Sequence, residues 1–269
     1  MPRNKPRQPF TPNNRKGKIK MHLLKQLKTK KGRDETGLFI VEGEKYVAEI
    51  PPHWEIIRYI TSQTFKIQNE KILAQYKQIA PVETLRDPLF ESFSTTLSPQ
   101  GIVAIVRQKV YYMPNTLSGN FFLLGESLQD PGNIGTLIRT AAAAGANSLI
   151  LTEGSADLYN PKVQRAAAGA ALRLPIITKA NPAETLAFFK HQGILLYAAH
   201  PRGRALPYET DMKKGFCLLI GNEAHGLSTE TLAQADARIR LPMLADSESL
   251  NASVAGSILL YEAVRQRMG

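Results

Sequence analysis

Several features that mark other classes of protein are scarce or missing in this sequence of 269 residues. Cys217 is its only cysteine, which excludes an internal disulfide and any zinc site built on several thiolates. No apolar run reaches the roughly 18 residues of a membrane span, and no apolar stretch of about 7–15 residues follows the basic N-terminus as in a secretory signal. We therefore expect a cytoplasmic protein with no membrane segment and no metal.

Acidic residues are absent from the first 33 positions, which hold twelve Lys or Arg. The rest of the chain has 22 basic residues against all 23 acidic ones, so the net charge of +11 arises entirely at the N-terminus. Residues 1–18 also contain four prolines and almost no core-forming side chains, which predicts a disordered basic arm. Such an arm is typical of phosphate contact with a nucleic acid; the alternative is a solubilising tail.

Hydrophobic periodicity divides the remainder into two α/β parts. Residues 19–107 predict a small domain that begins with an amphipathic helix over 19–31, and residues 108–119 predict a linker. From residue 120 to the end, strands and helices alternate. The predicted strands are 121–125, 148–151, 175–178, 194–199, 216–221 and 238–241, and the predicted helices are 134–144, 161–171, 183–191 and 250–267. This rhythm predicts a mostly parallel sheet with helices on both faces.

Three clusters of unusual residues lie at the predicted carboxyl ends of strands, where α/β sheets bind their ligands. None forms a G-x-G-x-x-G or G-x-x-x-x-G-K-[ST] pattern, which argues against a standard dinucleotide or nucleoside triphosphate site. In the first cluster, Asn133 is a candidate N-cap, and Arg139 lies one helical turn from Gly135, where a backbone or a ligand can approach closely. An arginine near the start of a helix suits a phosphate; the alternative is a surface arginine.

The second cluster runs from an apolar strand into a turn bounded by two glycines. Gly221 and Gly226 allow a positive φ or a close backbone approach, and Asn222 and Glu223 follow the end of the strand. The alternative is an ordinary strand-to-helix loop in which Ser228 caps the next helix and His225 faces solvent.

The third cluster spans residues 239–258. Ser249 is a candidate cap of the last helix, and Gly256 with its neighbouring alanines gives that helix a flat face for tight packing. Asn251 and Ser253, if buried, need hydrogen-bond partners.

In their order and separation these clusters resemble the three motifs of the SpoU (TrmH) branch of the SPOUT methyltransferases. The matching stretches are Asp130 to Gly135 with Arg139, Gly221 to Glu223 with Gly226, and Leu241 to Met243 with Ser249 to Ser253. Ala167 stands where many members carry a serine, so we assign it no chemical role. Residues 37–44 and 98–102 resemble the ribosomal-protein-like RNA-binding domain that precedes many of these catalytic domains.

The resemblance implies an α/β fold in which a SPOUT trefoil-knotted catalytic domain, residues 120–269, with a mostly parallel sheet, follows a small α/β ribosomal-protein-like domain. It implies S-adenosyl-L-methionine as cofactor and a homodimer in which two subunits complete each site. The residues implied to bind the cofactor are Ile220, Gly221, Asn222, Leu241, Met243, Leu250, Asn251 and Ser253.

The reaction implied is methylation of a ribose 2′-OH in structured RNA, and ribosomal RNA is favoured over transfer RNA. Arg139 is our candidate for the essential residue, where its permanent cation would hold a phosphate and stabilise a developing alkoxide. Glu223 is the candidate proton acceptor, and Asn133 would orient the ribose or Arg139. Three alternatives stay open: a transfer RNA methyltransferase, a SPOUT enzyme that methylates a base, and a non-catalytic, ribosome-associated RNA-binding protein.

Overall fold

The computed structural model describes residues 21–113, 117–244 and 249–269. The predicted basic arm of residues 1–18 lies outside these ranges, as do three residues of the predicted linker. The chain divides into two compact units. One consists of the residues up to Lys109 together with Tyr159–Pro161, and the other of Val110–Leu158 and Lys162–Gly269.

The first unit is built on a four-stranded sheet of order β1-β4-β2-β3. Its strands are β1 (Leu38–Glu42), β2 (Ile56–Ser62), β3 (Val82–Leu85) and β4 (Ile102–Arg107). Its helices are α1 (Met21–Leu27), α2 (Lys30–Thr36), α3 (Glu44–Ala48), α4 (Gln63–Gln68), α5 (Glu70–Ile79) and α6 (Asp87–Phe93). β4 is antiparallel to both of its neighbours, and β2 and β3 are parallel.

One helix was predicted over residues 19–31, but the structure has α1 and α2 in its place. Thr29 interrupts the helix because its backbone is extended and its hydroxyl caps α2, accepting a hydrogen bond from Gly32 N at 3.1 Å. Gly32 then lies against the last turn of α1, where a Cβ atom would come within 2.2 Å of Gln26 O. The chain therefore folds back at this point.

The second unit holds a six-stranded sheet of order β10-β8-β9-β5-β6-β7, in which every pair is parallel. Its strands are β5 (Phe121–Gly125), β6 (Ser148–Thr152), β7 (Ile176–Ala180), β8 (Leu195–Ala199), β9 (Phe216–Ile220) and β10 (Ala237–Ile239). Its α-helices are α7 (Pro131–Ala143), α8 (Pro161–Ala167), α9 (Pro182–His191), α10 (Thr229–Gln234) and α11 (Ala252–Met268). The mostly parallel α/β fold predicted for this part of the chain is confirmed.

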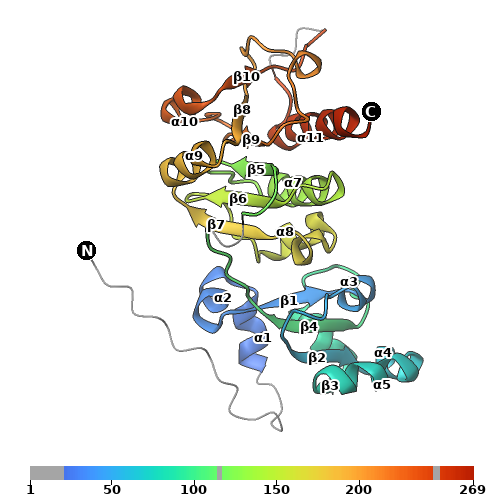
Figure 1. The fold of residues 1–269 in the computed structure, drawn as a ribbon. Coiled ribbons are helices and arrows are strands. Elements are labelled where there is room, and N and C mark those ends of the chain that lie inside the picture. The colour runs from blue at the N-terminus through green and yellow to red at the C-terminus, as the bar shows by residue number, and fades with distance from the viewer. Residues whose placement is uncertain (1–20, 114–116, 245–248) are drawn as a thin grey trace. The chain divides into compact units, whose positions relative to one another are not determined.

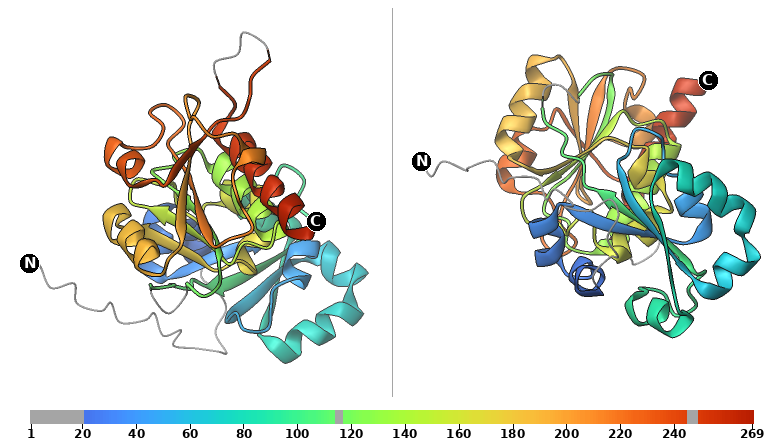
Figure 2. Two further views of the ribbon diagram at one scale, coloured as in Figure 1. Left: turned by 45° about the horizontal axis from the view of Figure 1, so that its top comes forward. Right: turned by 90° about the horizontal axis from the view of Figure 1, so that it is seen from below.

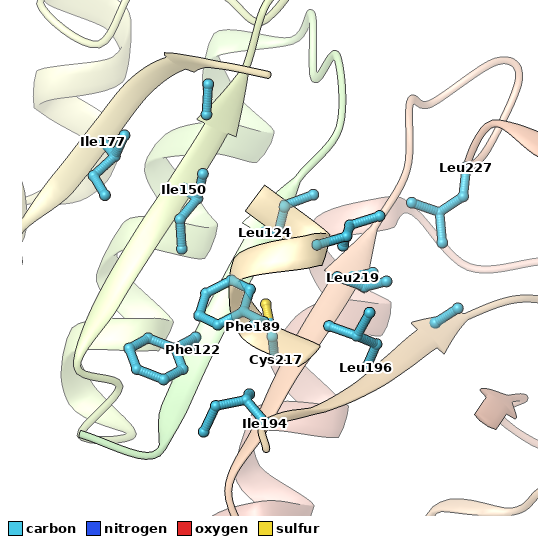
Figure 3. Close-up of a cluster of buried hydrophobic side chains, with 13 residues drawn as sticks. Phe122, Leu124, Ile150, Ile177, Phe189, Ile194, Leu196, Cys217, Leu219 and Leu227 are labelled. Carbon is cyan, nitrogen blue, oxygen red and sulfur yellow. The ribbon is translucent and has the colours of Figure 1, made fainter. Parts of the chain in front are cut away.

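Helices cover both faces of the parallel sheet. α9 and α10 lie on one face and α7, α8 and α11 on the other (Figure 1 and Figure 2). Phe189 of α9 packs on Phe122 of β5 with ring centroids 4.9 Å apart, in the core that Figure 3 shows. Cys217 is fully buried in the same core, and burial raises the pKa of its thiol well above the ordinary value. The single cysteine is therefore a packing residue.

The order of the strands in the second sheet brings the three clusters close together. After β7 at one edge, the chain crosses to β8, and β9 then enters between β8 and β5. The last helix, α11, packs against α7 and β9 on the side of the sheet that carries α7. The three clusters thereby come from segments that are neighbours in space. The trefoil knot stays a prediction.

Candidate active site

A cavity of about 340 Å³ lies at the carboxyl ends of β8, β9 and β10. Its lining residues come from the loop after β8, the turn after β9, the segment after β10 and the first turns of α11. They are Ala199 to Arg202, Ile220 to Leu227, Ile239, Leu241, Met243, Ser249, Leu250, Ala252, Ala255 and Leu259. The volume lies within the roughly 300–1,000 Å³ typical of small-molecule sites.

The turn after β9 is held by its own backbone. Asn222 and Gly226 exchange two hydrogen bonds, Asn222 N to Gly226 O at 3.0 Å and Gly226 N to Asn222 O at 2.9 Å. Gly226 has φ +71°, and a Cβ atom on Gly221 would lie 2.1 Å from the Gly226 carbonyl carbon. Both reasons given for glycine in the sequence are confirmed: a positive φ at Gly226 and a close backbone approach at Gly221.

A chain of polar side chains behind the cavity joins the three clusters. Asn133 of α7 donates from Nδ2 to Glu223 Oε1 at 2.9 Å. On its other side, Asn133 Oδ1 lies 3.1 Å from the hydroxyl of Ser253, which also lies 2.7 Å from Asn251 Oδ1. Asn133 and Ser253 are buried. The partners that the sequence required for Ser253 are therefore supplied by the first cluster and by Asn251.

The Glu223 carboxylate anchors the cavity turn to the start of α7. Besides the Asn133 bond, its oxygens accept from the backbone N–H groups of Gln129 and Asp130, both at 3.2 Å. Burial raises the pKa of Glu223, but the hydrogen bonds from Asn133 and from the backbone lower it by more, so the net pKa lies below the ordinary value. Glu223 is therefore held as a carboxylate.

Asn133 and Ser249, the candidate caps of α7 and α11, do not cap these helices. Asp130, not Asn133, caps α7: its Oδ1 accepts from Asn133 N at 2.8 Å, and Pro131 occupies the first turn, where a missing N–H has no cost. Asn251, not Ser249, caps α11, accepting from Ser253 N at 2.9 Å. Asn133 is thus free to turn its side chain towards Glu223.

The structure brings most of the predicted residues together. Those that line the cavity are Ile220, Gly221, Asn222, Glu223, Leu241, Met243 and Leu250. Asn133, Asn251 and Ser253 lie in the polar chain behind it. Arg139 is the exception: it is exposed on α7 and does not line the cavity of its own chain. The exposed His225 lies at the rim.

Two cavity residues were missed in the sequence. His200 and Arg202 follow β8, and His200 Nδ1 accepts from Arg202 N at 3.1 Å. Burial, then the charges of Arg238 and Arg202, lower the pKa of His200 below its ordinary value, which favours the neutral imidazole. Nothing in the spacing around residue 200 indicates a site, because its role depends on β8 lying between β9 and β10.

A third residue that was missed in the sequence, Glu126, holds the segment that follows the cavity turn. Glu126 follows β5 and is 8% exposed. Its carboxylate accepts from Ser228 N at 3.1 Å, from the Ser228 hydroxyl at 2.7 Å and from the Thr231 hydroxyl at 3.1 Å. Glu126 therefore fixes the start of α10, where Ser228 is the N-cap as the alternative reading of the second cluster proposed. The sequence did contain a signal for Glu126, because it is an acidic residue directly after an apolar strand.

The described part of the chain offers neither a membrane-spanning helix nor a cluster of metal-binding side chains. No helix there has the length and apolar character needed to cross a membrane. No three His, Cys, Asp or Glu side chains in the same residues gather into a possible metal site.

Comparison with known proteins settles the family. The model of the SpoU rRNA methylase family matches residues 120–261, and that of the MRM3-like substrate-binding domain matches residues 18–104. The chain belongs to the SpoU rRNA methylase family. The resemblance seen in the three clusters is thereby confirmed.

Relatives and solved structures extend the likeness over nearly the whole chain. The 23S rRNA (guanosine(2553)-2′-O)-methyltransferase RlmP of Bacillus subtilis is 31% identical over 88% of this SpoU-family chain and 92% of its own. The SpoU methyltransferase AviRb of Streptomyces viridochromogenes, solved with AdoMet, superposes with a TM-score of 0.82 at 27% identity, covering 93% and 98% of the two chains. An AdoMet-bound rRNA methyltransferase of Sinorhizobium meliloti has a TM-score of 0.81 at 30% identity, with 91% and 94% covered.

Proposed function

We propose that this protein transfers the methyl group of S-adenosyl-L-methionine to a ribose 2′-OH of ribosomal RNA. The observation that carries the proposal is the polar chain Glu223–Asn133–Ser253, which ties all three family motifs to one cavity. The relatives named for ribosomal RNA support that substrate, and one of them, RlmP, matches 88% of this chain. Transfer RNA enzymes of the family match 55% to 57% of it.

The cavity suits the cofactor in shape and chemistry. Gly221 offers bare backbone at its floor, since a Cβ atom there would overlap the chain at Gly226. Ile220, Leu241 and Leu250 supply apolar walls for a flat adenine ring. The side chain of Asn222 shapes the turn, donating to Ser127 O and accepting from Ala224 N and His225 N. The proposed cofactor-binding residues are the eight named from the sequence. Asn251 and Ser253 do not line the cavity and would contribute indirectly, by holding the residues that do.

S-adenosyl-L-methionine supplies an electrophilic sulfonium methyl group when bound. The protein must hold the 2′-OH in line with that methyl group and stabilise the charge that develops on oxygen. Arg139 cannot serve as a base, because a guanidinium stays protonated. Its proposed role is to bind the adjacent phosphate and stabilise the alkoxide. Glu223 is the proposed proton acceptor, and its hydrogen bonds to Asn133 and to the backbone of Gln129 and Asp130 give it a second role, positioning α7.

We further propose a homodimer that forms along α11. Val254, Ile258 and Tyr261 are between 44% and 52% exposed and recur at intervals of three or four residues, so they form one apolar stripe on the outer side of the helix. A helix that is apolar on two sides is usually covered on both. We propose that a second copy of this chain covers the stripe. Arg139 is exposed on the neighbouring α7 and does not line the cavity of its own chain, so in such a dimer it can act on the partner's cavity.

The remaining proposals follow from the sequence. The division into a basic arm (1–18), an RNA-binding domain (19–107), a linker (108–119) and a catalytic domain (120–269) assigns RNA affinity to the first two parts. We place the protein in the cytoplasm, where ribosomal RNA is modified and the single cysteine stays reduced.

The test is methyl transfer from labelled S-adenosyl-L-methionine to ribosomal RNA from cells that lack the protein, followed by mapping of 2′-O-methyl sites. Alkaline hydrolysis separates the candidates, because a 2′-O-methyl group protects the adjacent phosphodiester whereas a base methyl group does not. Protection at a discrete nucleotide supports the proposal. Label that is incorporated without protection points to base methylation. No label, with no heat of cofactor binding by calorimetry, leaves the RNA-binding alternative.

A further inference from the structure

Four exposed arginines lie together beside the cavity, on two adjacent segments of the second unit. Arg202 and Arg204 belong to the loop after β8, and Arg238 and Arg240 belong to β10 and the residue after its end. β10 is the edge strand of the sheet next to β8 (Figure 1). Arg202 lines the cavity itself.

Backbone hydrogen bonds fix the two segments against each other. His200 N donates to Ile239 O at 2.9 Å, Ala205 N to Arg238 O at 3.2 Å, and Arg240 N to Ala205 O at 3.0 Å. Ala205 and Ile239 form a parallel bridge. The loop therefore continues the sheet beyond β10.

Gly203 makes this approach possible. It is buried, and a Cβ atom there would lie 2.4 Å from Arg238 O and 2.9 Å from Arg240 N. Only glycine fits at this point. The arginines on either side of Gly203 are consequently held beside β10.

Alternation directs the other two arginines outward. Ile239 is 1% exposed and faces the core, so Arg238 and Arg240 face away from it. Among residues 21–113, 117–244 and 249–269, none of the four arginines forms an ion pair with a carboxylate. Arg238 donates one hydrogen bond, to Leu232 O at 3.1 Å. Burial is the main cause of the lowered pKa of His200, and the charges of Arg238 and Arg202 lower it further.

We propose that Arg202, Arg204, Arg238 and Arg240 form a phosphate-binding surface that holds the RNA backbone at the mouth of the cavity. A guanidinium group can donate two parallel hydrogen bonds to a phosphate, and four guanidinium groups without a carboxylate partner on a rigid edge form a preorganised anion site. The assignment of RNA as the occupant rests on the proposed function. This surface differs from the basic arm, because the chain after Arg33 is close to neutral and the four charges are a local concentration.

The test measures RNA affinity against salt for the full-length protein. Arg204→Ala with Arg240→Ala removes two charges that do not line the cavity, and Lys213→Ala with Lys214→Ala removes two exposed charges at the amino end of β9 as the matched control. The probe is ribosomal RNA from cells that lack the protein, in filter binding over a range of KCl. Calorimetry with S-adenosyl-L-methionine checks that both variants keep an intact cavity.

The slope of log K against log salt should become shallower by about 1.4 in the arginine variant, since each single-strand phosphate contact contributes about 0.7. The lysine variant should keep the wild-type slope, and Arg204→Lys with Arg240→Lys should retain most of it. An unchanged slope in the arginine variant, or an equal change in the lysine control, overturns the proposal. A wild-type protein that binds RNA but transfers no methyl group defeats the proposed function alone, because the slope is read without activity.

Discussion

At the scale of single residues, Glu223 raises the question of whether it moves a proton or holds the site together. A general base works best with a free lone pair and a pKa near the operating pH. Glu223 instead accepts three hydrogen bonds, and its pKa is lowered. The same bonds tie the turn after β9 to the first turn of α7. Positioning is therefore the role that its surroundings favour.

Replacing Glu223 with glutamine tests this through pH. A carboxylate whose pKa is lower in the folded state stabilises the fold above its ordinary value of 4.5, and this contribution is lost as the pH falls through the folded value. The wild type should therefore lose stability below pH 4.5 more steeply than Glu223→Gln, as measured by urea unfolding at several pH values. Parallel curves for the two proteins would contradict the lowered pKa.

The same variant separates the two roles at neutral pH. If Glu223 positions the turn, Glu223→Gln should weaken cofactor binding about tenfold, which corresponds to one lost charge-assisted bond of roughly 1.5 kcal/mol. If it accepts the proton, kcat should fall while the Kd for the cofactor stays unchanged.

Asn133 carries the next prediction, because it bridges Glu223 and Ser253. Asn133→Ala removes one hydrogen-bond partner from the exposed Glu223 carboxylate and one from the buried Ser253 hydroxyl, which keeps its bond to Asn251, so the cost should be about 1 kcal/mol. Thermal unfolding should show the loss, and calorimetry should show weaker cofactor binding. Asn181→Ala, which removes an N-cap on α9, far from the polar chain in sequence, is the control: it should lower stability by about 1 kcal/mol and leave the cofactor Kd alone.

At the scale of elements, the turn after β9 works through its backbone. Substitution by alanine should have different effects at Gly221 and at Gly226. Gly221→Ala drives a Cβ atom into the chain at Gly226 and Leu227, whereas Gly226→Ala meets nothing within 4 Å and only strains a positive φ. We expect Gly226→Ala to cost about 1–2 kcal/mol and Gly221→Ala to cost more and abolish cofactor binding. Thermal unfolding and calorimetry check both, and equal effects would refute the close-approach argument.

Elements with strong periodicity could be predicted from the sequence, and short ones could not. The strands after residue 120 and helices such as α9 follow from apolar runs and their spacing. α4, α6 and β3 were missed, because each has fewer than eight residues and depends on tertiary packing. The caps Asp130 and Asn251 were missed because neighbouring polar residues compete for the same position.

The site residues that lie within a sequence motif could be predicted from the sequence. Gly221, Glu223 and Leu241 are adjacent to clear glycine and proline signals. His200 and Arg202 have no such signal: they reach the cavity only because β8 is the strand between β9 and the edge strand β10. Strand order is set by long-range pairing, which local periodicity does not encode.

At the scale of the whole molecule, mixed dimers test whether Arg139 acts on the partner's site. Arg139→Ala removes the proposed cation, and Leu241→Trp fills the cavity; each variant alone should be inactive. If Arg139 acts across the dimer, a mixture should recover roughly a quarter of wild-type activity, since half of the dimers are mixed and each has one complete site. If the mixture stays inactive while its dimers form normally, as judged by analytical ultracentrifugation, Arg139 acts within its own chain or not at all.

The N-terminal arm carries the last prediction, which rests on its charge alone. Deleting residues 1–18 should weaken RNA binding and flatten its salt dependence, because six basic residues are removed. Cofactor binding by calorimetry should not change. A salt slope equal to that of the full-length protein would show that the arm makes no phosphate contacts.

The position of β9 has a consequence for how the protein is made. β9 is the fifth of six strands to leave the ribosome, yet it fills the gap between β5 and β8. Until residues 216–220 emerge, both of these apolar strands have an unpaired edge that can pair with another chain. Protein truncated just before β9 should therefore aggregate, and translation at that point is the stage at which nascent chains most need a chaperone.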